Sequence, residues 1–256
     1  MGVLKVCFQL SCKITKKILY SPKVFAMDRK KFLVIPAGGS GVRMGADIPK
    51  QFLMLEGKPI LRLTIERFLE AVPDVHIVTV LPEAHIGWWR QYCAREGFNC
   101  PQRLVQGGFT RFHSVKNALQ YIPDGAVVAV HDAVRPLISA GKVRELFAAA
   151  QDAPAVIPAT PSTDTLKTVS KRDDGVPVVT GTVDRSAVWG VQTPQVFHSE
   201  ILKKAYGQGY DTLFTDDASV VSAAGVPVVC IEGERTNIKI TTPEDLAIAE
   251  AILSLR

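Results

Sequence analysis

From Phe32 onward, short apolar runs rich in β-branched residues alternate with longer segments of helical periodicity. The apolar runs are nearly continuous, which is typical of strands buried on both faces of a parallel sheet. Parallel neighbours need crossover connections, and the helical segments between the runs supply them. The order of the segments therefore predicts an α/β domain with a mostly parallel sheet.

The expected elements cover most of the chain. Strands are expected at 32–36, 75–81, 103–106, 126–131, 154–160 and 226–231. Helices are expected at 59–71, 83–97, 110–122, 139–151, 199–207, 216–224 and 243–255. Helices between successive parallel strands can cover both faces of the sheet, so the fold is expected to be Rossmann-like.

Residues 161–186 interrupt this rhythm, because polar and apolar residues alternate there around the turn sequence Asp173-Asp174-Gly175. Period-two alternation about such a turn predicts an antiparallel hairpin. The hairpin would project from the domain as an arm. Its apolar side could be covered by a second subunit, and the alternative is a solvated flap over the site.

The composition excludes several classes of protein. The chain has 256 residues, of which 47% are hydrophobic and 21% charged, and no apolar run approaches the ~18 residues of a membrane span. Disordered, fibrous and integral membrane proteins are thus excluded. Five cysteines without a CxxC pair favour reduced thiols over a disulfide framework.

The net charge of +5 is concentrated at the N-terminus, where residues 1–26 carry five lysines and no acid. From Met27 onward, 25 basic residues balance 25 acidic ones, so no nucleic-acid-binding face is expected. We interpret residues 1–31 as a basic extension, either an over-extended start or disordered tail, or an organellar transit peptide or membrane-surface helix. The domain is expected at 32–256, in the cytoplasm unless the extension is a transit peptide.

A glycine-rich loop follows the first strand, with glycines at 38, 39 and 41. Such a loop can turn its backbone N–H groups toward an anion, and Arg43 and Lys50 add charge that suits a triphosphate. The loop lacks the third glycine of a dinucleotide-binding fingerprint and the Gly-Lys-Ser/Thr of a P-loop. The alternative is a tight strand-to-helix turn with solvated charges.

Asp132 ends an apolar strand, and ligands collect at the carboxyl ends of parallel strands. Its carboxylate could hold Mg²⁺ against a triphosphate, or it could cap the next turn. His131 is interpreted as a hydrogen-bonded strand-end residue. Asp216 and Asp217 fit an N-cap and first helical turn better than a metal site.

The motifs resemble those of nucleotidyltransferases with a nucleotide-diphospho-sugar transferase type of fold, and in particular the 2-C-methyl-D-erythritol 4-phosphate cytidylyltransferases. The resemblance covers nearly all of 32–254 and is carried by PAGGSGVRM with PKQF (36–44, 49–52), GGFTRFHSV (107–115), HDAVRP (131–136), TDTLK (163–167), TVDRSAVWGVQTPQVF (182–197), TDDAS (215–219) and NIKITTPEDL (237–246). It implies transfer of CMP from CTP to methylerythritol phosphate, with release of pyrophosphate, in non-mevalonate isoprenoid synthesis.

The resemblance also implies a role for each site residue. The expected catalytic cations are Arg43, Lys50 and Lys239. The expected nucleotide contacts are Ala37, Gly38, Gly39, Ser40, Gly41, Gly108 and Ser114. The expected acceptor contacts are Arg135, Thr165, Lys167, Arg185 and Thr193, those of the arm entering a partner subunit's site in a homodimer, and Asp132 would bind Mg²⁺.

Some assignments keep an alternative. Arg135 could instead support the turn after Asp132, and Lys239 could be a solvent-facing strand lysine. Phe109 and Phe112 stand where this family often has polar residues and could pack in the core. Arg111 is expected outside direct contact. The rival functions are a ribitol-5-phosphate cytidylyltransferase and a non-catalytic nucleotide-binding regulator.

Overall fold

The computed structural model describes residues 29–38 and 48–256. The predictions for Gly39, Ser40, Gly41 and Arg43, and most of the N-terminal extension, lie outside the described residues.

The centre of the fold is an eight-stranded mixed sheet, in which β12 pairs with β7 and the other strands follow the order β10-β7-β11-β6-β1-β4-β5. The pairs β6-β1, β1-β4, β4-β5 and β7-β12 are parallel, as the apolar runs predict. The strands are β1 (Lys31–Pro36), β4 (His76–Leu81), β5 (Gln102–Gln106), β6 (Val127–Val130), β7 (Ala155–Pro161), β10 (Trp189–Val191), β11 (Gln195–His198) and β12 (Val229–Glu232).

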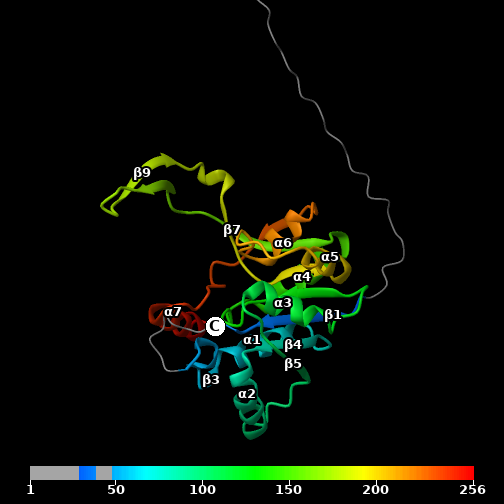
Figure 1. Ribbon diagram of the computed structural model, residues 1–256. Coiled ribbons are helices and arrows are strands. Elements are labelled where there is room, and N and C mark those ends of the chain that lie inside the picture. The colour runs from blue at the N-terminus through cyan, green and yellow to red at the C-terminus, as the bar shows by residue number, and fades with distance from the viewer. Residues whose placement is uncertain (1–28, 39–47) are drawn as a thin grey trace, which may run out of the picture.

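Helices cover both faces of this sheet (Figure 1). One apolar layer joins α1, α2 and α4 to the sheet through side chains such as Leu33 and Ile35. The other joins α3, α5 and α6 through Phe32 and Val34. Successive residues of β1 thus point to opposite layers, which explains its continuous apolar sequence. The helices are α1 (Ile60–Ala71), α2 (Glu83–Arg95), α3 (Arg111–Leu119), α4 (Ala140–Asp152), α5 (Ser199–Tyr206), α6 (Asp217–Ala223) and α7 (Pro243–Ser254).

Two strands of the sheet were not predicted. β10 and β11 run antiparallel to β7, and β11 is also antiparallel to β6. Each has only three or four residues, which is too short for a periodic signal in the sequence. They return the chain from the arm to the sheet, which makes the sheet mixed rather than wholly parallel.

A third, smaller apolar cluster lies where the chain ends. There α7 packs near the two-stranded ribbon of β2 (Met54–Leu55) and β3 (Lys58–Pro59), with Ile240 fully buried between the elements. This packing brings residues 237–240 close to the segment that follows β6, where the backbone N–H of Ile240 donates to the carbonyl oxygen of Val134 over 2.9 Å. No helix in the described part of the chain is long and apolar enough to cross a membrane.

The predicted hairpin is present and projects away from the rest of the molecule (Figure 1). Its strands are β8 (Lys167–Lys171) and β9 (Pro177–Thr182), which pair antiparallel. Gly175 has a positive φ of 81° in the connecting turn, a conformation that glycine adopts without steric cost. Nearly all side chains of the two strands are exposed, so the arm has no core of its own.

Candidate active site

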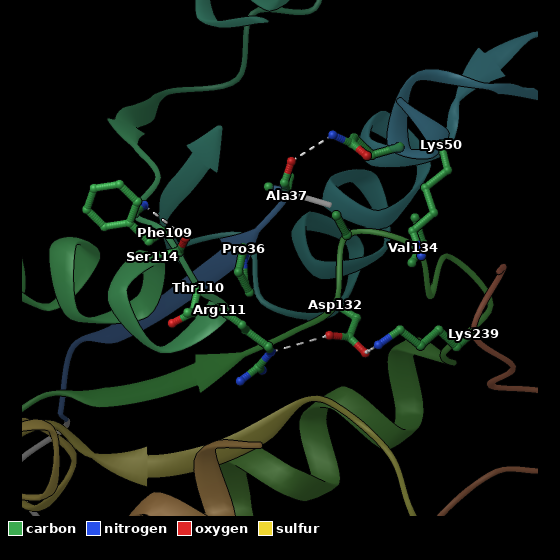
Figure 2. A pocket seen from close by; sticks show the side chains of 14 residues that line it. Pro36, Ala37, Lys50, Phe109, Thr110, Arg111, Ser114, Asp132, Val134 and Lys239 are labelled. Atoms are coloured by element: carbon green, nitrogen blue, oxygen red, sulfur yellow. Dashed lines mark hydrogen bonds and ion pairs between the residues drawn. The ribbon is translucent and has the colours of Figure 1, made fainter. Parts of the chain in front are cut away.

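A cavity of about 240 Å³ lies at the carboxyl ends of β1, β5 and β6 (Figure 2). Parallel strands present their carboxyl ends at one edge, so segments distant in sequence meet there. The lining residues are Pro36, Ala37, Gly38, Lys50, Gln51, Gly108, Phe109, Thr110, Arg111, Ser114, Asp132, Ala133, Val134 and Lys239. Seven of the predicted site residues, from Ala37 to Lys239, are therefore brought together.

The loop after β5 is held close to the start of α3. The backbone N–H of Gly108 donates to Ser114 Oγ over 3.1 Å, and a β-carbon at position 108 would collide with His113. Thr110 caps α3 by accepting from the backbone N–H of His113. Only glycine permits this close approach, so the loop presents backbone to the cavity at position 108.

The two aromatic residues of this loop separate. Phe112 is buried in the core against Tyr206, with ring centroids 4.7 Å apart. Phe109 is fully exposed at the rim of the cavity, so the expectation of core packing is correct for Phe112 and wrong for Phe109.

The segment after β1 is fixed by a glutamine that is not among the predicted site residues. Gln51 is 1% exposed, and its Nε2 donates to the carbonyl oxygen of Ala37 over 2.7 Å. It lies in the short 3₁₀ helix Lys50–Phe52, so the same turn that orients Lys50 toward the cavity also anchors the beginning of the glycine-rich loop. A polar residue between Lys50 and the buried Phe52 was the available signal.

Asp132 is the centre of charge in the cavity. Its carboxylate lies 3.0 Å from Lys239 Nζ, 3.3 Å from Arg135 Nε and 3.8 Å from Arg111 Nε. Burial opposes ionisation, but the three cations outweigh it and hold the pKa of Asp132 well below its usual range. Figure 2 shows Arg111 on one side of this carboxylate and Lys239 on the other.

Arg111 is itself held by an ion pair with Asp217. Its guanidinium lies 2.5 Å from Asp217, which is fully buried and also accepts a hydrogen bond from Tyr206 Oη over 2.6 Å. Burial disfavours the charged guanidinium, but Asp217 and Asp132 raise the pKa of Arg111 further above its usual value. Arg111 therefore lines the cavity as a permanent cation, and the expectation that it stays outside direct contact with the substrates remains a prediction.

The acids of the TDDAS motif behave as predicted. Asp216 is the N-cap of α6 and forms a capping box with Ser219. Asp217 lies in the first turn of α6 and forms an ion pair with Arg111. Among the described residues, no group of three or more His, Cys, Asp or Glu side chains could hold a metal ion.

His131 is a hydrogen-bonded structural residue, as expected. Its ring nitrogens lie 3.0 Å from the carbonyl oxygen of Arg135 and 3.1 Å from Thr193 Oγ1. Full burial lowers the pKa of His131 to about 4, so the imidazole is neutral near pH 7. Thr193 Oγ1 also accepts from the backbone N–H of Asp132 over 3.0 Å, and both side chains thus support Asp132 from inside the fold.

Arg135 does not line the cavity. It contacts Asp132 through Nε, and its NH1 donates to the carbonyl oxygen of Asn237 over 2.7 Å. This position matches the alternative that Arg135 supports the turn after Asp132. Thr193 is buried behind Asp132 in the same way, so neither residue faces the cavity in this structure.

The arm residues lie apart from the cavity of their own chain. Thr165 is exposed, Lys167 Nζ donates to Thr182 Oγ1 over 2.6 Å, and Arg185 donates to the carbonyl oxygen of Thr163 over 3.1 Å. The arm extends away from the domain that carries the cavity (Figure 1). The structure therefore does not bring these three residues together with Lys50 and Lys239 of the same chain.

A family model for 2-C-methyl-D-erythritol 4-phosphate cytidylyltransferase matches residues 32–255. An enzyme of that name from Porphyromonas gingivalis strain W83 is 47% identical over 229 residues, covering 89% of this chain and 100% of its own. One from Azobacteroides pseudotrichonymphae is 46% identical over 226 residues, covering 88% and 99%.

Solved structures agree with these sequence matches. The 2-C-methyl-D-erythritol 4-phosphate cytidylyltransferase of Francisella tularensis superposes with a TM-score of 0.72 at 32% identity, covering 87% of this chain and 99% of its own. The Thermus thermophilus enzyme superposes with a TM-score of 0.67 at 32% identity, covering 88% and 99%.

Proposed function

The chain belongs to the 2-C-methyl-D-erythritol 4-phosphate cytidylyltransferase family, and we propose that the cavity at the carboxyl end of its sheet binds CTP as a magnesium complex. As a member of this family, it transfers CMP from CTP to 2-C-methyl-D-erythritol 4-phosphate in non-mevalonate isoprenoid biosynthesis. The products are 4-diphosphocytidyl-2-C-methyl-D-erythritol and pyrophosphate.

The chemistry requires charge stabilisation more than proton transfer. A phosphate oxygen of the acceptor forms a bond to the α-phosphorus of CTP, and the bond from that phosphorus to the pyrophosphate oxygen breaks. The nucleophile is already an anion, so no general base is needed, in keeping with the neutral, fully hydrogen-bonded His131. The obstacle is the repulsion between two polyanions and the charge that builds on the five-coordinate phosphorus.

The observation that carries the proposal is the charge of the cavity. Its described lining includes three cations, Lys50, Arg111 and Lys239, against one carboxylate, Asp132. Lys50 and Lys239 contact the triphosphate and its transition state, together with Arg43, which lies outside the described residues. Arg111 is tied to Asp217 and contributes a fixed positive potential.

The cytosine base and the metal ion bind to different parts of the cavity. The backbone of Gly108, with Ser114 behind it, contacts the cytosine. Mg²⁺ fits the donor set, because it is commonly held by one or two carboxylates with substrate phosphates and water, and Asp132 is an ionised carboxylate on the cavity wall. When bound, the ion neutralises phosphate charge as a Lewis acid.

The acceptor site is completed by a second subunit. Thr165, Lys167 and Arg185 bind methylerythritol phosphate, with Arg185 suited to a bidentate contact with the phosphate. Support comes from the position of these residues on a projecting arm, away from their own cavity (Figure 1). A C₂ homodimer would place each arm at the partner's cavity.

A pyrophosphate-release assay tests this proposal. CTP is paired with 2-C-methyl-D-erythritol 4-phosphate and then with ribitol 5-phosphate, each with Mg²⁺ and with EDTA. We expect turnover only with the first acceptor and only with the metal. Equal turnover with ribitol 5-phosphate would favour the rival acceptor, and full activity in EDTA would remove the metal from the proposal.

A further inference from the structure

Asn237 is fully buried and lies two residues before Lys239. Its Nδ2 donates to the carbonyl oxygen of Thr193 over 2.9 Å and lies 3.4 Å from Gln192 Oε1. Both neighbours are acceptors, so the orientation of the amide is defined by its surroundings. The backbone carbonyl oxygen of Asn237 accepts from Arg135 NH1 over 2.7 Å.

These contacts close a ring of hydrogen bonds behind the cavity. Starting from Asn237, the ring passes through Arg135 to the carboxylate of Asp132, over 2.7 Å and 3.3 Å. The backbone N–H of Asp132 then donates to Thr193 Oγ1 over 3.0 Å, and Thr193 returns to Asn237 over 2.9 Å. The ring thus fixes the relative positions of three segments that are distant in sequence: 132–135, Thr193 and Asn237.

The backbone on both sides of Asn237 is anchored as well. Its N–H donates to the carbonyl oxygen of Glu234 over 2.9 Å, and the Glu234 carboxylate binds Ser139 at the start of α4. Ile240, which is fully buried, donates its N–H to Val134 over 2.9 Å. The backbone that carries Lys239 is therefore fixed by hydrogen bonds at the residues on either side of it.

Lys239 has little restraint from packing, because its side chain is 42% exposed. A flexible lysine stabilises a transition state well only when its backbone origin is fixed, since small misplacements are costly. The contact with Asp132 holds the ammonium group at 3.0 Å, and Asn237 holds the backbone from which it extends. We infer that Asn237 is a positioning residue, acting through Lys239, that keeps this lysine and Asp132 aligned for cytidylyl transfer.

This inference rests on the proposed role of Lys239. Its test is a double-mutant cycle in the full chain with Asn237→Ala, Lys239→Ala and the double variant, varying CTP and methylerythritol phosphate separately. We expect Asn237→Ala to lower kcat on the order of tenfold, with both KM values within about threefold. In the Lys239→Ala background the same substitution should cost less than about twofold, because the group it positions is gone.

Gln102→Ala is the matched control for lost stability. The Gln102 side-chain amide oxygen accepts from Thr79 Oγ1 and Trp89 Nε1, at the end of β5 opposite the cavity. Both variants should lower Tm by roughly 2–8 °C, but Gln102→Ala should keep kcat within about twofold. An equal loss of kcat in the control would mean that Asn237 acts only through stability and would overturn the inference.

The remaining outcomes separate the inference from the proposed function. If Lys239→Ala is slow but Asn237→Ala turns over normally, or if the two losses are additive, the positioning role is wrong and the proposed function stands. A normal kcat for Lys239→Ala removes the proposed catalytic role of Lys239 and with it the positioning role of Asn237, whereas the cytidylyltransferase activity stands. Should Asn237→Ala fail to fold, Asn237→Leu replaces it in the cycle, because the volume is roughly kept and the amide donor is lost without a buried charge being added.

Discussion

The cavity region and the arm are organised in opposite ways. Around the cavity, charged and polar groups are buried and bonded to one another. Asp217 is fully buried, and the buried Asn237 closes a hydrogen-bonded ring. In the arm, apolar side chains are exposed, with Val169 at 60% and Val179 at 59%. The arm is stabilised mainly by the pairing of its own two strands.

This difference shows which part of the site the single chain can assemble. Isolated two-stranded hairpins are marginally stable, so the arm needs another surface to gain a defined position. The cavity gains its geometry from the core that surrounds it. The domain thus builds the cavity proposed for the nucleotide by itself, whereas the proposed acceptor half depends on assembly.

The largest effect should come from uncoupling the buried pair behind the cavity. Asp217→Asn removes the negative charge that faces the Arg111 guanidinium at 2.5 Å, and uncompensated buried charges are strongly destabilising. We expect a loss of about 3 kcal/mol in unfolding free energy, at the lower end because Asp132 still lies 3.8 Å away. Urea denaturation measures it, and a loss below about 1 kcal/mol would contradict the electrostatic account.

Removing a cavity cation should act on rate rather than stability. Lys50→Ala should lower kcat by about 10²-fold with a well-folded protein, as expected for a charge that acts mainly in the transition state. Lys58→Ala is the matched control, because Lys58 lies nearby and pairs with Glu66, outside the cavity lining. A Lys50→Ala variant with normal kcat and only a raised KM for CTP would mean ground-state binding.

Removing an arm cation should act on the acceptor alone. Arg185→Ala should raise the KM for methylerythritol phosphate by about tenfold or more while the KM for CTP stays within about threefold. Arg172→Ala, in the same arm, is the control and should change neither. A matching rise in the KM for CTP would place Arg185 in the nucleotide half of the site.

Subunit mixing sharpens the contrast further. At methylerythritol phosphate concentrations well below its KM, where Arg185→Ala and Lys50→Ala chains each turn over slowly, the mixed chains should regain up to roughly a quarter of wild-type activity, since half the dimers are hybrids with one intact site of two. Co-purification of differently tagged chains verifies exchange of subunits. No recovery after verified exchange would show that each arm serves its own chain or has no role in the reaction.

The smallest effect should come from the arm's own ion pair. Arg172 and Asp174 lie 2.6 Å apart, but their side chains are 64% and 47% exposed. Exposed pairs contribute little, so Arg172→Ala should change the unfolding free energy by less than about 0.5 kcal/mol. A loss comparable to that of Asp217→Asn would mean that the arm is packed against another surface.

The sequence alone determined the features that depend on neighbouring residues. Continuous apolar runs predicted the parallel strands, the turn at Asp173-Asp174-Gly175 predicted the arm, and capping preference placed Asp216 at the start of α6. The resemblance of the motifs implied that Asp132, Lys50 and Gly108 belong to one site, and all three line one cavity.

Only the tertiary structure decided the pairings between distant segments. Arg111 meets Asp217 across 106 residues, and Arg135 meets Asn237 across 102. No local pattern encodes either contact. The antiparallel strands β10 and β11 are also too short for a periodic pattern that would predict them. The local sequence pattern predicts which side chains each segment buries. The partners of a buried charge depend on how separate helices and strands pack together, because only that packing excludes water around the charge.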